Sequence, residues 1–180
     1  CVQNVNVTDD ENPLVACTDI TIQLDATGNV SIVAGAINAG ASDNCGIATT
    51  TASQTAFDCS HVGANTVTLT VVDIYGNSSS CDATVTVEDN VDPIALCQAI
   101  TVQLDATGNA SITEAQIDNG SNDACGISGL SLDITTFDCG DIGANAVVLT
   151  VTDNNGNTST CGATVTVEDN VAPDAVCQDI

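Results

Sequence analysis

The sequence has no lysine and no arginine among its 180 residues, and its 24 acidic residues give a formal net charge of −24. Proteins neutralise nucleic-acid phosphates with basic side chains, so this absence excludes a nucleic-acid partner. It also excludes attraction to an anionic membrane surface. No apolar run is long enough to cross a bilayer, so we expect no membrane insertion. A cation such as Ca²⁺, which prefers oxygen ligands, is the partner that this composition favours.

Aromatic residues are almost as scarce: Phe57, Phe137 and Tyr75 are the whole set. The core must therefore be aliphatic and thin, as in small domains that need covalent cross-links. Hydrophobic residues still make up 43% of the chain, which argues against the disorder that high charge alone would predict. Valine, isoleucine and threonine dominate and favour β-strands.

Ten cysteines are present, with no CxxC pair and no Cys/His cluster of zinc spacing. They predict disulfides, which persist in an oxidising environment. We therefore expect an extracellular protein, at the cell surface or in a secreted fibre.

The chain repeats itself with a period of 80 residues, the length of a small domain. A proline recurs with this period, at Pro13, Pro93 and Pro173. Proline fixes its own φ and restricts the residue before it, so the joints should be stiff and extended. We predict the following organisation: residues 1–12 are the last strand and linker of a preceding repeat, 13–92 and 93–172 are two repeats, and 173–180 start another.

Alternating apolar and polar residues predict strands over 65–73 and 145–153. Each is followed by a Gly-Asn turn and a second alternating run, which predicts a long hairpin in every repeat. Ser111 and Glu114 have capping-box spacing and predict one helical turn near 113–118. Short strands between regularly spaced turns predict an all-β fold, with a β-sandwich in each repeat.

One repeat carries, in order, a proline with a cysteine four residues on, Asp-x-Cys-Gly, a phenylalanine, Gly-x-Asn-x-Val, Asp-x-x-Gly-Asn, a cysteine and Val-x-Val-x-Asp. This order resembles the hyalin repeat, an immunoglobulin-like module. The tandem version without Lys or Arg, with LDATGN and four cysteines, is similar to the repeats of giant surface adhesins of Bacteroidetes, including gliding-motility adhesins. The resemblance covers the whole chain. It implies tandem immunoglobulin-like β-sandwich domains in an extended array, which serve as stalks or adhesive arrays.

Four cysteines per repeat allow three connectivities, and the residues alone leave them open. The resemblance to the hyalin repeat implies that the cysteine after the proline pairs with the one in the final strand. It thus implies the pairs Cys17–Cys81 and Cys97–Cys161, together with Cys45–Cys59 and Cys125–Cys139. Cys1 and Cys177 would then belong to neighbouring repeats. A rival scheme, Cys17–Cys45 with Cys59–Cys81, stays open.

The acidic joints before each proline are the first candidate for a functional site, and they loosely resemble the calcium-binding linkers between cadherin repeats. In each repeat the hairpin tip, Asp73–Asn77 or Asp153–Asn157, should face the joint that precedes that repeat, because the following strand leaves from the opposite end. Converging carboxylates without a basic residue repel unless a cation lies between them. Solvated turns are the competing interpretation, since Asp and Asn are common turn residues. The predicted calcium ligands are Asp9, Asp10, Glu11, Asp73, Glu88, Asp89, Asp92, Asp153, Glu168 and Asp169, and the loops at 43–44 and 118–123 are weaker ligand sources.

Nothing in the sequence favours an enzyme. His61 is the one histidine, and its counterpart in the next repeat is Asp141, so we interpret it as a surface turn residue. The motif Asp25–Asn29 lacks the alternating acids of an EF-hand and predicts a plain turn.

We therefore expect a stalk or filament segment of an extracellular repetitive adhesin, stiffened by disulfides and by calcium at its joints. Its partners would be neighbouring repeats of the same chain and other copies in a filament, which the strand at 2–8 could join by adding to a neighbour's sheet. The alternative is a module that binds a glycan or a protein through its most variable segments, 47–56 and 127–136.

Overall fold

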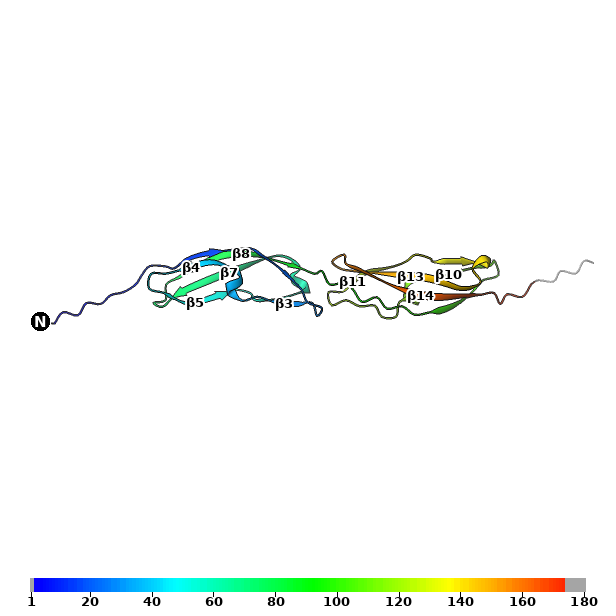
Figure 1. Cartoon of the computed structure of the whole chain (residues 1–180), viewed down its shortest axis with the longest axis horizontal. Coiled ribbons are helices and arrows are strands. Elements are labelled where there is room, and N and C mark those ends of the chain that lie inside the picture. Colours follow the sequence, from blue (N-terminus) through cyan, green and yellow to red (C-terminus); the bar gives the residue numbers. More distant parts are fainter. Residues whose placement is uncertain (1, 174–180) are drawn as a thin grey trace, which may run out of the picture. The chain divides into compact units, whose positions relative to one another are not determined.

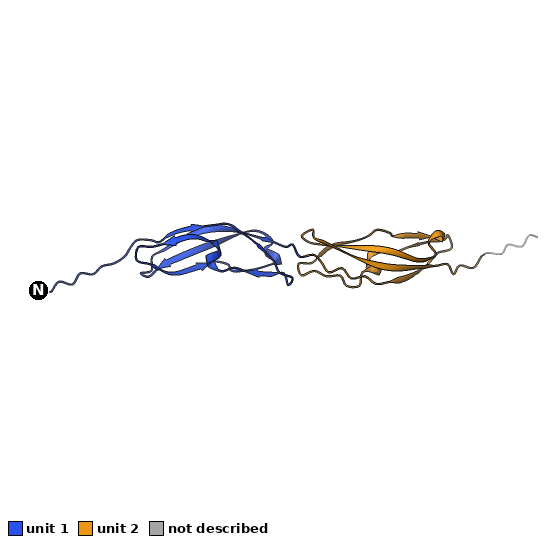
Figure 2. Cartoon of the chain, viewed as in Figure 1, with its two compact units in different colours: residues 1–91 blue, residues 92–180 orange. Residues whose placement is uncertain are grey.

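The structure is a computed structural model that describes residues 2–173. The chain forms two compact units, Cys1–Val91 and Asp92–Ile180 (Figure 2). Strands make up most of the regular secondary structure of each unit (Figure 1). The predicted start of a further repeat at 173–180, apart from Pro173, and the pairing of Cys1 and Cys177 lie outside the described residues.

The first unit has eight strands and two short 3-10 helices. They are β1 (Leu14–Cys17), β2 (Ile20–Gln23), β3 (Asn29–Ser31), η1 (Ala34–Ile37), β4 (Asn38–Ser42), β5 (Ile47–Ala52), β6 (Ala56–Asp58), η2 (Cys59–His61), β7 (Gly63–Asp73) and β8 (Ser78–Glu88).

The second unit repeats this order, with the counterparts of β1 and β4 reduced to the isolated bridges Ile94↔Asn122 and Cys97↔Asp118. Its elements are β9 (Ile100–Gln103), β10 (Asn109–Ser111), α1 (Glu114–Ile117), β11 (Ile127–Leu132), β12 (Thr136–Asp138), η3 (Cys139–Asp141), β13 (Gly143–Asp153) and β14 (Thr158–Glu168).

A four-stranded sheet is the larger layer of each unit, in the order β2-β8-β7-β5 and β11-β13-β14-β9. The predicted hairpin is its centre: β7 and β8 pair antiparallel from Gly63↔Val87 to Val72↔Ser78. In each sheet the strand that comes first in the sequence runs parallel to the strand that comes last. In the first unit these are β2 and β8, which pair from Ile20↔Val85 to Gln23↔Glu88. The short ladders β1–β4 and β3–β6 complete the sandwich of the first unit.

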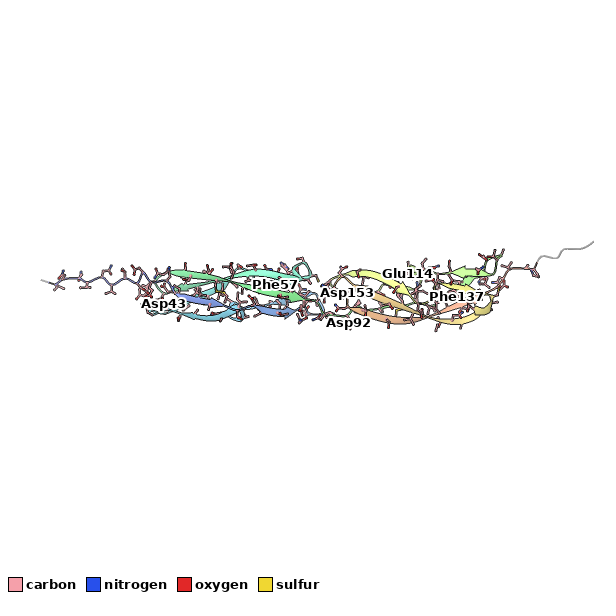
Figure 3. The ribbon with its side chains drawn as sticks, turned by 90° about the horizontal axis from the view of Figure 1, so that it is seen from above. Asp43, Phe57, Asp92, Glu114, Phe137 and Asp153 are labelled. Carbon is pink, nitrogen blue, oxygen red and sulfur yellow. A yellow bond between two sulfur atoms is a disulfide. The ribbon has the colours of Figure 1, made fainter. Side chains whose placement is uncertain are left out.

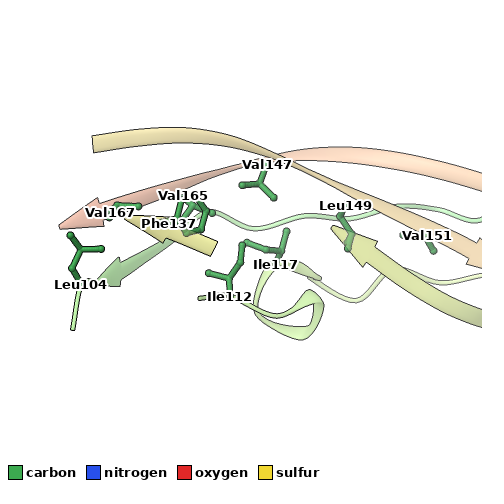
Figure 4. Packing of buried hydrophobic residues seen from close by; sticks show 9 residues of the cluster. All are labelled: Leu104, Ile112, Ile117, Phe137, Val147, Leu149, Val151, Val165 and Val167. Atoms are coloured by element: carbon green, nitrogen blue, oxygen red, sulfur yellow. The ribbon is translucent and has the colours of Figure 1, made fainter. Parts of the chain in front are cut away.

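The core is aliphatic and one side chain deep. In β13, Val147, Leu149 and Val151 are fully buried, because alternate residues of a strand point to the same face. They pack with residues of β14, α1 and the neighbouring loops (Figure 4). The cluster of the second unit consists of Leu104, Ile112, Ile117, Phe137, Val147, Leu149, Val151, Val165 and Val167.

Two disulfides close the sandwiches. Cys17 in β1 is bonded to Cys81 in β8, and Cys97 is bonded to Cys161 in β14. These are the two pairs that the hyalin-like resemblance implies.

The other two expected pairs are wrong. Cys45 and Cys139 are free, whereas Cys59 and Cys125 are disulfide-bonded, so neither Cys45–Cys59 nor Cys125–Cys139 is formed. The rival scheme, which pairs Cys17 with Cys45, is excluded by the Cys17–Cys81 bond.

The helical turn is present as α1, but its predicted cap is not. The helix is capped by Thr113, whose backbone N–H donates to Gln116 Oε1 at 2.9 Å, and not by Ser111, which ends β10. The first turn of a helix needs an acceptor next to its own free N–H groups, so the residue adjacent to Glu114 takes that role. Residues 2–13 contain no strand. None of the helices among the described residues is long and apolar enough to span a membrane.

We predict that Leu149→Ala destabilises the second unit by about 2–5 kcal/mol, because it removes a fully buried side chain and leaves a cavity. The neighbouring Val148→Ala is the matched control: Val148 is 39% exposed on the opposite face of the same strand, and its loss should cost about 0.5 kcal/mol or less. Urea unfolding of both variants measures the difference. Equal effects would contradict the assignment of the core face.

Candidate metal centre

Three loops of the first unit meet at the end where β1 begins, which we call the upstream end. The opposite end, where β8 finishes, is the downstream end. Asn77 Nδ2 of the hairpin tip donates to the carbonyl oxygen of Asp9 at 3.2 Å. The Ile74 N–H of the same tip donates to Gly46 O at 3.2 Å, and Asn44 Nδ2 donates to Glu11 Oε2 at 3.0 Å. The prediction that the tip at 73–77 faces the joint at 9–13 is therefore confirmed for this unit.

Asp73 organises the hairpin tip. It is 2% exposed, and its Oδ1 accepts hydrogen bonds from the backbone N–H groups of Tyr75, Gly76 and Asn77 at 2.6–2.9 Å. Its Oδ2 accepts from Asn77 Nδ2 at 2.7 Å. Gly76 has a φ of 98°, which a side chain would strain. The sequence Asp-x-x-Gly-Asn thus encodes the turn itself, and both oxygens of Asp73 are used by it.

The pKa of Asp73 is lowered by these hydrogen bonds. Burial acts in the opposite direction, because it disfavours the charged form, but the side chain and backbone N–H of Asn77, with Tyr75 and Gly76, outweigh it. The carboxylate is therefore held ionised inside the turn.

Asp9, Asp43 and Cys45 form an acidic cluster beside this tip. One carboxylate oxygen of each aspartate and the Cys45 Sγ all lie within 4.8 Å of one another. Asp43 Oδ1 accepts from the backbone N–H groups of Cys45 and Gly46, and Asp9 Oδ1 accepts from the Glu11 N–H. Asp9 Oδ2 is buried and has no hydrogen-bond partner among the described residues. A buried acceptor without a partner is costly, and a bound cation is one way to satisfy it.

The Cys45 thiol belongs to the same electrostatic environment. Its pKa is raised chiefly by a hydrogen bond from the thiol to the Asp9 carboxylate, which favours the protonated form, and then by partial desolvation and by the charges of Asp9, Asp43 and Asp73. A thiol kept protonated is a poor metal ligand, and Ca²⁺ takes oxygen ligands. The group therefore fits a hard cation held by Asp9 and Asp43 better than a thiolate metal.

Other predicted ligands of the first unit lie elsewhere. Asp10 and Glu11 are exposed beside the cluster. Glu88 is at the downstream end, where its Oε2 accepts from Gln23 Nε2 at 2.6 Å, and Asp89 Oδ1 accepts from the Val91 N–H. Asp43, the weaker candidate from sequence, is in the cluster, because the pairing of Ile47 with Asp73 brings its loop to the hairpin tip.

In the second unit, Asp153 repeats the role of Asp73. Burial opposes its ionisation, but hydrogen bonds from Asn157, Asn155 and Gly156 lower its pKa. Glu168 accepts from Gln103 Nε2 at the downstream end of this unit, and Asp169 Oδ1 accepts from the Val171 N–H. Asp92 is exposed.

Two further motifs are local turns. Asp25 Oδ1 accepts from the backbone N–H and the hydroxyl of Thr27 and from the Asn29 N–H, so this motif closes its own loop. His61 Nδ1 accepts a hydrogen bond from the Asp58 N–H, and this contact caps η2. The same nitrogen lies 2.8 Å from Asp58 Oδ1. Both residues use their polar atoms within the turn.

The structure was compared with known proteins. Human protocadherin-24 EC1-2 matches with a TM-score of 0.46 and 13% identity over 88% of this chain and 99% of that chain. Drosophila N-cadherin EC1-4 matches with a TM-score of 0.44 and 14% identity over 88% and 50%, and the protocadherin GammaB4 extracellular domain with 0.40 and 16% over 88% and 32%. The chain spans between 32% and 52% of three protocadherin chains that it matches.

No model of a protein family matches the sequence, and no curated protein matches it. The resemblance to hyalin repeats and to Bacteroidetes adhesins therefore stays a prediction.

We predict a pH effect from the Asp73 turn. Its pKa is lower in the folded than in the unfolded chain, so the unfolded state takes up a proton first as the pH falls. The stabilisation is complete above the unfolded value of about 3.9 and is lost as the pH falls through the folded pKa. Asp73→Asn should therefore lower the unfolding temperature at pH 7 more than at pH 3.

The measurement is thermal unfolding in chelator between pH 7 and pH 3, with the exposed Asp10→Asn as the matched charge control. A difference between wild type and Asp73→Asn that stays constant over this range would contradict the assigned role of the carboxylate.

Proposed function

We propose that the chain is a load-bearing stalk segment of an extracellular repetitive adhesin or fibre, in which residues 13–92 and 93–172 are successive repeats. In this proposal residues 1–12 end a preceding repeat and 173–180 start a following one. The chain's ends would pass tension from one repeat to the next. The disulfides and the cadherin ectodomains among the matched structures support an extracellular setting.

The observation that carries this proposal is the position of the disulfide in each unit. Cys17 lies in the first strand and Cys81 in the last, 64 residues apart, and Cys97 and Cys161 have the same separation. A chain pulled from both ends passes its tension directly through this bond. Residues 18–80 and 98–160 are therefore removed from the load path.

The strand order supports the same role. β2 and β8 are parallel neighbours, and one belongs to the start of the unit and the other to its end. Pulling the chain apart would shear this ladder, so that its hydrogen bonds would have to break together. While the Cys17–Cys81 bond is intact, tension bypasses β2. The β2–β8 ladder would resist extension only once that bond is broken.

Calcium at the joints is the second part of the proposal. In the first unit the ligands would come from Asp9 and Asp43, with backbone oxygens of the same loops, because Asp9 Oδ2 is a buried acceptor and the chain has no Lys or Arg to neutralise the pair. The ion would hold the segment before Pro13 against the hairpin tip. It would thereby stiffen the junction with a preceding repeat.

A ligand-binding module is the second candidate. The most variable segments, 47–56 and 127–136, contain β5 and β11, which are the outer strands of their four-stranded sheets. An outer strand offers unpaired backbone groups that an extended peptide can join. Binding of a peptide or glycan to this edge is compatible with a stalk.

We predict that millimolar Ca²⁺ raises the unfolding temperature of the first unit relative to chelator, because it is bound by the folded state. Asp9→Asn with Asp43→Asn should abolish this shift. Asp82→Asn, which removes an exposed carboxylate of β8 outside the cluster, is the matched control and should retain it. Differential scanning calorimetry measures the shift, and a wild-type profile that is the same in both buffers would disprove the calcium site but not the stalk.

We also predict that reduction lengthens the extension of each repeat under force. Cys17 and its counterpart Cys97 lie 80 residues apart (97 − 17). The disulfide loop spans 64 of these residues. The remaining 16 residues can extend while the disulfide is intact. At about 3.5 Å per residue, reduction should release roughly 220 Å more per repeat. Single-molecule force spectroscopy with and without reductant measures this increment, and equal increments in both would refute the load path.

A further inference from the structure

The outer strand of the second unit has a free edge that differs from the edge of its counterpart in the first unit. β11 ends the sheet order β11-β13-β14-β9, as β5 ends the order β2-β8-β7-β5, so among residues 2–173 each has a strand neighbour on one side only. β11 begins at the end of the second unit that Asp153 marks in Figure 3, because Ile127 pairs with that residue. The two edges can therefore be compared position by position.

The backbone of β11 leaves two residues facing outwards. The Asp133 N–H donates to Val148 O at 3.2 Å, which makes this a hydrogen-bonded position of the β11–β13 ladder. Such positions alternate along an antiparallel ladder, so the N–H and C=O groups of Leu130 and Leu132 point away from β13. The side chains of both leucines pack against the core and hold the strand in place. An added strand would find two donors and two acceptors there.

Gly129 leaves room for another backbone at this edge. The register of β11 shifts between Ile127 and Gly129, but the same shift occurs in β5 between Ile47 and Thr49, so the bulge does not require glycine. The φ of Gly129 is not positive, and a Cβ at this position would meet no atom within 4 Å. Glycine in a strand often marks a close approach of another backbone, and here the space beside it is open.

Asp133 adds a negative charge that the first unit lacks. Its Oδ1 accepts from the Val148 N–H at 2.8 Å, as the Ser53 Oγ accepts from the Thr68 N–H at 3.0 Å in the first unit. A serine hydroxyl is therefore sufficient for this hydrogen bond. The exposed carboxylate of Asp133 is left to interact with a charged group of another molecule.

Charge decides which kind of strand fits the edge. The chain has a formal charge of −24 and no Lys or Arg, so a second copy would bring only repulsion to Asp133. A basic side chain on the added strand would form an ion pair with this carboxylate, and the field of the whole chain attracts a cationic partner. Ile134, which is 39% exposed and takes the place of Gln54 of the first unit, offers an apolar contact next to that charge.

We propose that β11 is a docking edge for an extended segment of a partner protein in which basic and apolar residues alternate. The segment adds to the four-stranded sheet as a further strand. Its backbone pairs with Leu130 and Leu132, it passes beside Gly129, and it places a Lys or Arg at Asp133. The inference rests on the ligand-binding candidate of the proposed function and narrows it to the second unit. It depends neither on the stalk nor on calcium.

Amide hydrogen exchange of the full chain, followed by NMR in chelator, tests this proposal. The probe is an end-blocked peptide of alternating lysine and valine, about eight residues long and so slightly longer than β11. Near saturation it should slow exchange at the Leu130 and Leu132 amides by about tenfold or more. Thr50 and Ala52, which face outwards from β5 by the same alternation, should keep their rates. Slowing at neither edge, or equally at both, would overturn the proposal.

The matched variant gives the second edge the residues of the first: Gly129→Thr, Asp133→Ser and Ile134→Gln. The first unit folds with these residues, so the unfolding temperature should not change, while the Kd for the peptide should rise about tenfold or more. The converse variant, Thr49→Gly with Ser53→Asp and Gln54→Ile, should give β5 the same protection at Thr50 and Ala52. An unchanged Kd in the first variant, or no new protection in the second, would contradict the assigned edge.

A fully N-methylated analogue of the peptide separates strand addition from simple attraction between opposite charges. It keeps every lysine but has no backbone N–H to donate, so it should lose the protection of Leu130 and Leu132 and bind with a Kd about tenfold higher or more. Equal binding of the two peptides would show that the chain attracts any polycation, and the proposal would fail. The load path of the stalk does not pass through β11, so that result would leave the stalk unaffected.

Discussion

The structure depends on a covalent bond that closes a very thin core. Each sandwich has one layer of valine, leucine and isoleucine between its sheets, with a single phenylalanine, and so buries little apolar surface for its length. A disulfide spanning 64 residues stabilises the folded state by about 4 kcal/mol in the chain-entropy account, which is a large part of the stability of a domain of this size. That bond joins the first strand of the unit to the last, and the proposed load path rests on this position.

The absence of basic residues shapes the turns. No Lys or Arg can pair with a carboxylate in this chain, and the aspartates of the turns accept hydrogen bonds from backbone N–H groups close to them in sequence. Asp25 and Asp105 do so in one turn type and Asp73 and Asp153 in another, and hydrogen bonds lower the pKa of all four. Each turn thereby becomes a small anion-binding nest that holds its own side chain. Asp9 is different, because its Oδ2 is buried without a backbone donor, and the calcium proposal rests on this oxygen.

Much of the fold could be predicted from the sequence, because it is encoded locally. The hairpins of β7–β8 and β13–β14 follow from residue alternation and from Asp-x-x-Gly-Asn, whose aspartate and glycine build the turn without help from the rest of the chain. The parallel pairing of β2 with β8 could not be predicted, because it joins residues 65 positions apart with no local signal. For the same reason Asp43 ranked below its neighbours as a ligand: its loop reaches Asp9 only through the pairing of β5 with β7.

The cysteines show how a repeat can mislead. Periodicity fixes which cysteines are equivalent, but a bond to the same repeat and a bond to the next one have the same period. Only the distance along β7 separates the two cases, and that distance requires knowing that Cys45 and Cys59 lie beyond opposite ends of one unbroken strand. The cysteines of one repeat need therefore not all be bonded to each other within one fold. In this chain each fold is closed by the bond between its first and last strands, Cys17–Cys81 in the first unit and Cys97–Cys161 in the second.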